Sequence, residues 1–480
     1  MARRAKRERL TPSGSGPGHP GRRPGVRSIV IVGAGFSGTM VAVHLLERAT
    51  SPLDISLIER RPAIGQGLAY STTLGTHVLN VPAARMGAKA DRVDDFQRWL
   101  KELEPEFGEF AAHGFVPRIW YGTYLQALLA QAEVLAAPGV ELRRVSGSVV
   151  SVESDSPEAG GSYLVRLASG QGIAAEAVVL ALGNLPAGDP PLERGSLAGL
   201  NEGGGDLYLP DGWDTEAVRA IPAEADILLI GTGLTMVDWA FSLGRQGHRG
   251  TIHAVSRRGL VPRSHGPAEA VELSEAIAAA PPTALGLSRA VRAEVVRTTA
   301  AGGDWRAVVD ALRPRTQALW AALPIAERRR FVRHLRPYWD VHRHRAAPHV
   351  AALIEEMRRS GRLVVHAGRL VSASTPSGAP AGDRAGRESG RGAEVTLRER
   401  RTGSALVLSV ARIVNTIGPG GDIRSSGEAL IDRLLADGLA QADPLGLGLR
   451  TANDGALLDR AGHPSTSMFT LGSTRRGDLW

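Results

Sequence analysis

Two short glycine-rich segments constrain the fold of this chain more than any other feature of its sequence. The first, GAGFSG at 33–38, follows the apolar run SIVIV and has the pattern G-x-G-x-x-G. The second, GTGLTM at 231–236, follows DILLI and keeps the first two glycines, with Met236 in place of the third. A strand, a glycine turn and a helix in this order form the phosphate-binding corner of a Rossmann unit. The sequence therefore predicts an α/β chain with two Rossmann-like dinucleotide-binding domains.

Each glycine of the first segment has its own expected role. Gly33 permits the tight turn, Gly35 leaves space for a pyrophosphate, and Gly38 lets helix and strand pack closely. The next strand, DISLIE, ends at Glu59, where an acid accepts hydrogen bonds from a ribose. We expect FAD here, because the turn lies near the start of a chain that carries a second such turn. The residues predicted to contact FAD in this region are Gly33, Ala34, Gly35, Phe36, Ser37, Gly38, Glu59 and Arg60.

The second segment is predicted to bind the nicotinamide cofactor. The strand that follows it, TIHAV, leads into Ser256, Arg257 and Arg258, with no acid at the ribose position. Arginines there attract a 2′-phosphate and donate paired hydrogen bonds to it, so NADPH is favoured over NADH. Surface ion pairs or contacts to the pyrophosphate would also explain these arginines. The predicted contacts are Gly231, Thr232, Gly233, Leu234, Thr235, Ser256, Arg257 and Arg258.

Two further apolar runs end in glycine and suggest where the chain passes between domains. VVLALGN reaches Gly183, and IVNTIGPG includes Gly418. Such steps are typical of two-dinucleotide flavoproteins, so both glycines are counted as cofactor contacts. We predict a disordered basic tail over 1–27 and an FAD-binding domain over 28–190. We also predict an NAD(P)-binding domain over 223–415 with a helical insertion over 268–358, and a return to the FAD-binding domain over 416–480.

The net charge of +8 is confined to one end of the chain. Residues 1–27 contain eight Arg or Lys residues and one Glu, so the remainder is close to neutral. This distribution disfavours nucleic-acid binding by the folded domains. No apolar run approaches the length of about 18 residues that a membrane-spanning helix needs, and the tail lacks the apolar segment of an export signal. We expect a cytoplasmic protein.

Nine ordered motifs between residues 28 and 480 resemble the bacterial FAD/NAD(P)-binding proteins of the YdhS type. They are GAGFSG, GQGLAYST (65–72), LNVPAARMGA (79–88), DDFQRWL (94–100), VPRIWYGTYL (116–125), IGTGLTMVD (230–238), SRRGLVPRSH (256–265), RPYWDVHRHRAAP (336–348) and TRRGDLW (474–480). That family is distantly similar to flavin-dependent N-hydroxylating monooxygenases. The resemblance implies an FAD domain interrupted by an NAD(P) domain, and implies no particular substrate. It also implies a further helix over the flavin beyond the position of Trp480, a segment that this sequence does not include.

The absence of cysteine removes one branch of flavoprotein chemistry. Disulfide reductases share the two-dinucleotide layout but need a cysteine pair beside the flavin. The F-x-G-x-x-x-H fingerprint of Baeyer–Villiger monooxygenases is also missing after the second turn. N-hydroxylation and simple NADPH oxidation both stay open.

Two segments supply candidates for catalysis and binding. In LNVPA, Asn80 and the backbone of Val81 are placed by analogy with this architecture along the flavin or the nicotinamide. In RPYWDVHRHRAAP, the basic side chains favour an anion site for a substrate carboxylate or a cofactor phosphate. His342 and His344 point to different helix faces and have no evident third ligand, so no metal is expected. Either histidine could act as a general acid or base, and the catalytic candidates are His342, His344, Arg343 and Asn80.

Together these features predict an FAD-dependent NAD(P)H oxidoreductase, with N-hydroxylation of a small amine or amino acid as one outcome. The partners expected are a small-molecule substrate and either O2 or a quinone as acceptor, with no membrane. One alternative is a flavin reductase that passes electrons to a partner or quinone. A second alternative is a flavin-bound sensor or scaffold without turnover.

Overall fold

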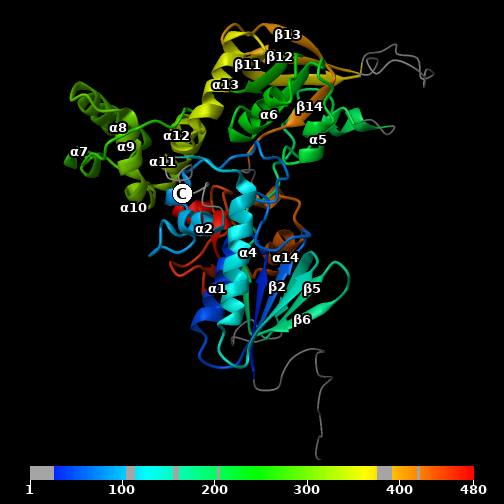
Figure 1. Ribbon diagram of the computed structural model, residues 1–480, viewed down its shortest axis with the longest axis vertical. Helices are drawn as coiled ribbons and strands as arrows, with labels where there is room; N and C mark the ends of the chain where they lie inside the picture. The colour runs from blue at the N-terminus through cyan, green and yellow to red at the C-terminus, as the bar shows by residue number, and fades with distance from the viewer. Residues whose placement is uncertain (1–25, 104–113, 155–161, 203–205, 376–391, 419–421) are drawn as a thin grey trace, which may run out of the picture.

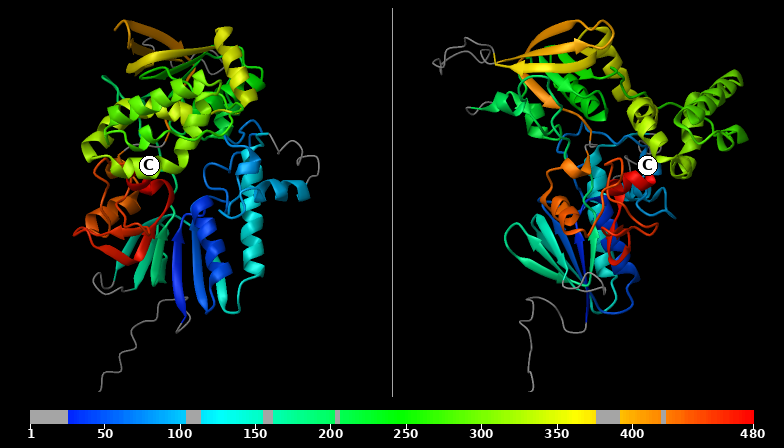
Figure 2. Two further views of the ribbon diagram at one scale, coloured as in Figure 1. Left: turned by 90° about the vertical axis from the view of Figure 1, so that its left-hand side faces the viewer. Right: turned by 180° about the vertical axis from the view of Figure 1, so that it is seen from behind.

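The computed structural model describes residues 26–103, 114–154, 162–202, 206–375, 392–418 and 422–480. Within these ranges the chain forms two α/β domains, one above the other in Figure 1, with a helical segment projecting beside the junction (Figures 1 and 2). The basic tail predicted over 1–27 lies outside the described residues except for its last two positions. The two-domain α/β fold agrees with the fold class predicted from the sequence.

The first domain is built on a six-stranded sheet in the order β15-β16-β7-β1-β2-β3. All neighbouring strands are parallel except β15, which pairs antiparallel with β16. Alternate residues of β1 point to opposite faces, as a strand requires. Ile31 packs toward α1 and α4, whereas Val30 and Val32 pack toward α14 and a three-stranded sheet, β4-β5-β6. These elements are β1 (Arg27–Val32), α1 (Phe36–Arg48), β2 (Leu53–Glu59), α2 (Asp95–Leu103), α4 (Arg118–Val134), β3 (Val140–Ser146), β4 (Val149–Ser154), β5 (Tyr163–Leu167), β6 (Gly172–Ala175), β7 (Ala177–Leu180), α14 (Ala429–Asp437), β15 (Ala456–Leu458), β16 (Pro464–Thr470) and α15 (Arg476–Leu479).

The second domain contains a seven-stranded sheet in the order β13-β12-β11-β10-β9-β14-β8. The last five strands of this order are parallel, and β12 and β13 extend the sheet antiparallel. Every residue of β9 is buried, because α6 and α13 cover one face and the segment around Leu197 and Leu200 covers the other. The edge strand β8 comes from residues before 223, the position at which the NAD(P)-binding domain was predicted to begin. These elements are β8 (Tyr208–Leu209), α5 (Thr215–Arg219), β9 (Ile227–Ile230), α6 (Leu234–Arg245), β10 (Ile252–Ser256), α13 (Pro348–Arg359), β11 (Leu363–Ser374), β12 (Ala393–Glu399), β13 (Ala405–Val410) and β14 (Arg412–Asn415).

A helical segment lies between β10 and α13 and reaches back to the first domain. The Trp320 indole Nε1 donates to the Gly477 carbonyl at 2.8 Å, and its ring stacks on Trp480 at 4.8 Å between centroids. This contact brings the helical segment beside the C-terminal end of the chain, as Figure 1 shows. The segment contains α7 (Glu275–Ala278), α8 (Ala284–Ala300), α9 (Trp305–Leu312), α10 (Thr316–Ala322), α11 (Ile325–Arg330), a π-helical turn (Phe331–Leu335) and α12 (Arg336–Arg343).

A buried ion pair joins the two domains directly. Arg118 on α4 places Nη2 2.8 Å from Oδ2 of Asp238 on α6, and both residues are buried. Thr76 and Ser242 form a second polar contact across the same junction, at 2.7 Å. Among the described residues, no helix is both long enough and apolar enough to cross a membrane.

Candidate functional site

The first glycine turn has the tight geometry that its sequence predicts. Gly33 has a φ of +97°, and a Cβ there would lie 2.4 Å from the Ala181 carbonyl oxygen. A Cβ at Gly38 would lie only 1.8 Å from the Gly33 carbonyl oxygen. Both positions therefore need glycine. The turn leads into α1, whose N-cap residue Gly35 provides no side-chain hydrogen bond, whereas Asp214 caps α5 with two hydrogen bonds. The exposed N–H groups and dipole of an uncapped helix start suit a phosphate.

Glu59 lies at the end of β2 and supports this turn. Its Oε2 accepts from the Ala34 N–H at 2.8 Å, and its Oε1 accepts from the Arg61 N–H at 2.9 Å. Each carboxylate oxygen retains a further lone pair, so a ribose contact is compatible with this arrangement. Arg60 is engaged elsewhere, because its guanidinium pairs with Glu428 at 3.0 Å near the surface.

The structure adds a segment to this site that the sequence reasoning missed. After β16 the chain turns at Gly472, and a Cβ there would lie 3.1 Å from the Ser37 hydroxyl oxygen. The next residue, Ser473, donates to the Gly183 carbonyl through a short hydrogen bond. The signal was present in the sequence, since MFTLG at 468–472 is an apolar strand that ends in glycine, as VVLALG does.

The second glycine turn repeats the first with one difference. A Cβ at Gly231 would lie 2.7 Å from the Thr416 carbonyl oxygen, which has the position of Ala181 in the first domain. Gly233 is the N-cap residue of α6 and makes no side-chain cap, and a Cβ there would meet no atom within 4 Å. Met236 is fully buried in the core below α6. The turn therefore keeps an open approach for a phosphate while a methionine fills the space beneath the helix.

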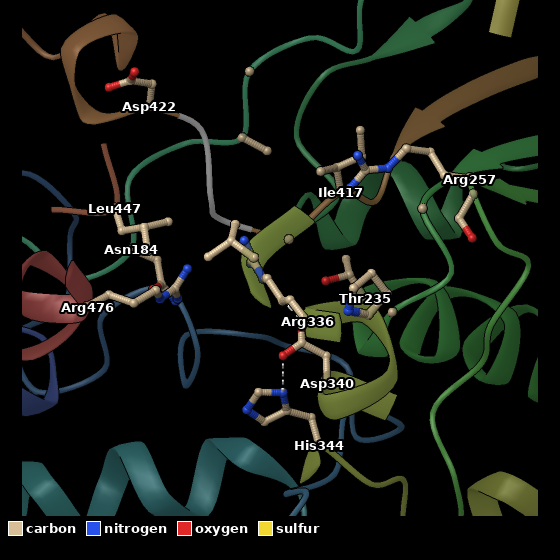
Figure 3. Close-up of a pocket in the computed structure, with 18 of the residues that line it drawn as sticks. Asn184, Thr235, Arg257, Arg336, Asp340, His344, Ile417, Asp422, Leu447 and Arg476 are labelled. Atoms are coloured by element: carbon tan, nitrogen blue, oxygen red, sulfur yellow. Dashed lines mark hydrogen bonds and ion pairs between the residues drawn. The ribbon is translucent and has the colours of Figure 1, made fainter. Parts of the chain in front are cut away.

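The second turn opens onto a cleft of about 1990 Å³ between the two domains and the helical segment. Its walls come from Gly183–Glu193, the turn at 230–235, α12, the loop at 444–448 and the C-terminal residues from 473. Figure 3 shows Asn184, Thr235, Asp340 and Arg476 around this space. The carboxyl ends of the parallel strands meet here, which is where open α/β sheets bind ligands.

The two arginines after β10 lie differently. Arg257 is exposed on the cleft, and partial burial followed by the charges of Arg258, Arg336 and Arg369 lowers its pKa. Arg258 lies over the ring of Tyr338 at 5.5 Å and donates to the His334 carbonyl at 3.2 Å. Arg258 therefore anchors the loop to the helical segment, while Arg257 and the unpredicted Arg369 are the cations nearer the end of β10.

The two candidate histidines are also separated. His344 lines the cleft, and its Nδ1 lies 3.8 Å from Oδ1 of Asp340. The His344 side chain is 56% exposed, yet desolvation by the surrounding cleft walls lowers its pKa more than Asp340 raises it, so the ring is neutral near pH 7. The His342 Nδ1 contacts the Tyr338 carbonyl oxygen at 2.7 Å, and its ring meets Trp305 edge-on at 4.8 Å, away from the cleft lining. The geometry thus favours His344 of the two.

The two predicted contacts in the LNVPA loop lie apart from the cleft lining. The Asn80 carbonyl oxygen accepts from His265 Nε2 at 2.8 Å, which ties the LNVPA loop to the second domain. Neither Asn80 nor Val81 is among the described residues that line the cleft, whereas Gly183, Arg343 and Gly418 are. Within the described ranges, no three His, Asp or Glu side chains are grouped as metal ligands would be.

Comparisons with known proteins agree with this architecture. Residues 30–185 match the protein family described as FAD-NAD(P)-binding. Over 142 residues, or 28% of the chain, the sequence is 31% identical to an L-aspartate N-monooxygenase (nitrosuccinate-forming) of Streptomyces cremeus. That match spans 20% of the length of the relative.

Two solved structures of amino-acid-oxidising enzymes are similar in fold over most of their length. An ornithine N-hydroxylase of Kutzneria sp. 744 superimposes with a TM-score of 0.61 at 16% identity, over 95% of this chain and 94% of that one. An L-lysine 6-monooxygenase of Pseudomonas syringae gives a TM-score of 0.61 at 16% identity, over 93% and 92%. The predicted fold class, two Rossmann-like dinucleotide-binding domains with a helical insertion, is therefore confirmed.

Proposed function

We propose that this chain is an FAD-dependent, NADPH-using monooxygenase that hydroxylates the nitrogen of a small amine or amino acid. The observation that carries the proposal is the pair of uncapped glycine turns, one in each domain. The second turn lines the large cleft, and the cleft reaches Gly183 and Ser473, next to the Gly472 segment that contacts the first turn. The match of residues 30–185 to an FAD-NAD(P)-binding family supports it, as do the N-hydroxylating neighbours in fold. We also propose that the chain is one of the YdhS-type proteins and that it is located in the cytoplasm.

The residues of both turns fit the two cofactors. The first turn, with Glu59 and the Gly472 segment, would hold FAD, and the second turn, with Arg257 and Arg369, would hold NADPH. When bound, FAD would supply the two-electron chemistry that links NADPH to O2. The chain itself binds both nucleotides, orients the amine in the cleft, and limits the access of water.

The overall reaction balances with these reactants. NADPH and a proton together supply two electrons and two protons, and O2 supplies both oxygen atoms. One oxygen atom enters an N–H bond of the amine and gives a hydroxylamine. The other leaves as water, together with NADP⁺. An amine must be neutral to react as a nucleophile, and His344 is a neutral base on the cleft wall that could accept its proton.

The test begins with the colour of the purified, FAD-loaded protein and its reduction by NADPH without oxygen. Bleaching of the flavin followed by an oxygenated amine on admission of O2 is the expected result. Bleaching with hydrogen peroxide or a reduced quinone as the sole product would favour the reductase alternative. A flavin that NADPH does not reduce would favour the sensor or scaffold.

A matched pair of variants shows which turn receives NADPH. Gly233→Asp places a negative charge where we expect the nicotinamide pyrophosphate, so NADPH reduction should fail while FAD stays bound. Gly75→Asp is the control, because a Cβ at Gly75 also meets nothing within 4 Å and that residue does not line the cleft. Unchanged NADPH kinetics in Gly233→Asp would contradict the assignment of the second turn.

A further inference from the structure

The second glycine turn is tied to the loop that follows β10. The hydroxyl of Thr232, in the turn, lies 2.8 Å from the Ser256 hydroxyl and 2.5 Å from the Leu260 carbonyl oxygen. The loop between these two residues carries a pair of arginines. Arg257 is exposed at the edge of the cleft (Figure 3), whereas Arg258 is half-buried against the helical segment. A ligand at the second turn would therefore lie beside a loop that Arg258 joins to the helical segment.

Arg258 contacts the π-helical turn that precedes α12. Its Nη2 donates to the Arg333 carbonyl at 3.4 Å and to the His334 carbonyl at 3.2 Å. Its guanidinium lies over the Tyr338 ring at 5.5 Å. Pro337 has no N–H, so it cannot donate to the carbonyl four residues earlier, that of Arg333, as an α-helix requires. Arg258 thus supplies a donor at the point where the proline removes one.

The other end of the same π-helical turn contacts the first domain. Phe331, its first residue, meets the rings of Trp320 and Trp480 edge-on, at 5.8 and 5.3 Å between centroids. These two indoles stack on each other at 4.8 Å, and Trp320 Nε1 donates to the Gly477 carbonyl at 2.8 Å. The π-helical turn therefore contacts Arg258 on one side and the C-terminal residues on the other.

The C-terminal residues that meet this turn also reach the first cofactor site. Gly472 and Ser473 begin the segment that ends at Trp480. A Cβ at Gly472 would lie 3.1 Å from the hydroxyl oxygen of Ser37 in the first glycine turn, and Ser473 donates to the Gly183 carbonyl. A continuous series of contacts thus joins the two glycine turns through the helical segment. Its middle member is a π-helical turn, a feature that is frequent at functional sites.

We propose that Arg258 is a positioning residue that transmits nucleotide binding at the second turn to the Trp320–Trp480 stack. Arg257 binds the nucleotide, whereas Arg258 holds the helical segment and the C-terminal residues in the orientation that reduction of the flavin requires. This inference rests on the proposed function, because it takes the ligand of the second turn to be NADPH. Coupling between two sites is shown by a change at one when the other is occupied. The decisive property is therefore a change at Trp480 that depends on Arg258.

The first test follows tryptophan fluorescence while NADP⁺ is added to the oxidised, FAD-loaded protein, and it requires no turnover. The wild type should show a change that Trp480→Phe lacks, which assigns the signal to Trp480. Arg258→Gln should lose this signal, although its Kd for NADP⁺ by titration calorimetry stays within about twofold of the wild-type value. Arg257→Gln should give the opposite result, because it removes a charged hydrogen bond to the nucleotide: a Kd raised about tenfold or more, with the full signal at saturation.

Three further variants separate positioning from folding. Arg258→Lys keeps a cation that can donate to the same carbonyls and lie over the Tyr338 ring, so it should restore much of the signal. If Arg258→Gln fails to fold, Tyr338→Ala replaces it, because this half-exposed ring lies outside the cleft lining and its loss should reduce the signal at unchanged Kd. Arg358→Gln breaks an exposed pair with Glu355 at 2.9 Å on α13 and is the matched control, which should behave as the wild type does.

The second test is stopped-flow reduction of the flavin by NADPH without oxygen. Arg258→Gln should lower the limiting rate about tenfold and leave the half-saturating NADPH concentration unchanged, because misplaced reactants slow the reaction without weakening binding. The inference is overturned by a Trp480 signal that persists without Arg258, by a wild type that binds NADP⁺ without this signal, or by a Kd that rises in Arg258→Gln as much as in Arg257→Gln. An Arg258-dependent Trp480 signal in a protein that yields no oxygenated amine would preserve it and overturn the monooxygenase proposal.

Discussion

The ion pair between Arg118 and Asp238 should contribute strongly to holding the two domains in a fixed orientation. Arg118 donates through Nη2 to Oδ1 and Oδ2 of Asp238, at 3.1 and 2.8 Å, and through Nε to the Val78 carbonyl at 2.9 Å. Both residues are less than a tenth exposed. Asp238→Ala would leave the guanidinium buried without its carboxylate. Removing one partner of a buried pair costs about 3–5 kcal/mol, because the other charge stays desolvated.

This loss has two measurable consequences. The thermal unfolding midpoint should fall by on the order of 10 °C, judged from the change per kcal/mol in domains of about 200 residues. The rate of anaerobic flavin reduction at saturating NADPH should fall more than the affinity for NADPH, because the cofactor turns stay intact while their relative orientation loosens. Differential scanning fluorimetry and stopped-flow absorbance measure these two quantities.

A double-mutant cycle separates the charge from the packing. Arg118→Met combined with Asp238→Leu replaces both partners with apolar side chains, and should recover much of the lost stability. The control is Glu153→Ala, which breaks the exposed pair with Arg166 at 2.6 Å and should change the midpoint little. The reasoning is refuted if Asp238→Ala behaves like the exposed control, or if the double variant is no more stable than either single one.

Three further predictions concern individual positions of the site. Gly38→Ala should lower the free energy of unfolding by about 3 kcal/mol or more and abolish FAD retention, because the new Cβ would overlap the Gly33 carbonyl. Denaturant unfolding and the flavin absorbance of the purified variant measure these two effects. His344→Gln should lower kcat/KM on the order of a hundredfold and remove the acid limb of the pH profile of kcat/KM. In the wild type this limb should lie below about pH 6.5, because desolvation lowers the His344 pKa and the ring must be unprotonated to accept a proton. The test is the pH profile of kcat/KM of this variant, in which Asp340, Arg343 and Arg476 are unchanged. Arg369→Ala should raise the KM for NADPH about tenfold with little effect on NADH, and equal effects on both cofactors would contradict a 2′-phosphate contact.

Local patterns were enough to predict the two turns. A glycine turn is set by a few consecutive residues, so Gly33, Gly38 and Gly231 could be assigned from the sequence. The end of β2 at Glu59 followed from the same local order of strand, turn and helix. The predicted α/β fold depends on these local units, which explains why it was correct.

Long-range contacts were not accessible in the same way. Arg258 looked equivalent to Arg257 in sequence, yet Tyr338 on α12 holds it, and only the tertiary fold brings α12 to that loop. The choice between His342 and His344 likewise depends on where α12 ends and on Trp305 from another helix. These assignments needed the packing of elements that are distant in sequence.

The two turns show how one backbone device can tolerate different packing. In each domain, the carbonyl of a residue after a neighbouring strand, Ala181 or Thr416, lies against the first glycine and fixes the turn. In the first domain the helix approaches so closely that Gly38 cannot carry a Cβ. In the second domain the fully buried Met236 occupies the same step of the pattern. The third glycine is therefore required by helix packing and not by phosphate access. Access for a phosphate depends on Gly233, where a Cβ would meet no atom within 4 Å. The absence of a third glycine is thus compatible with nucleotide binding at the second turn.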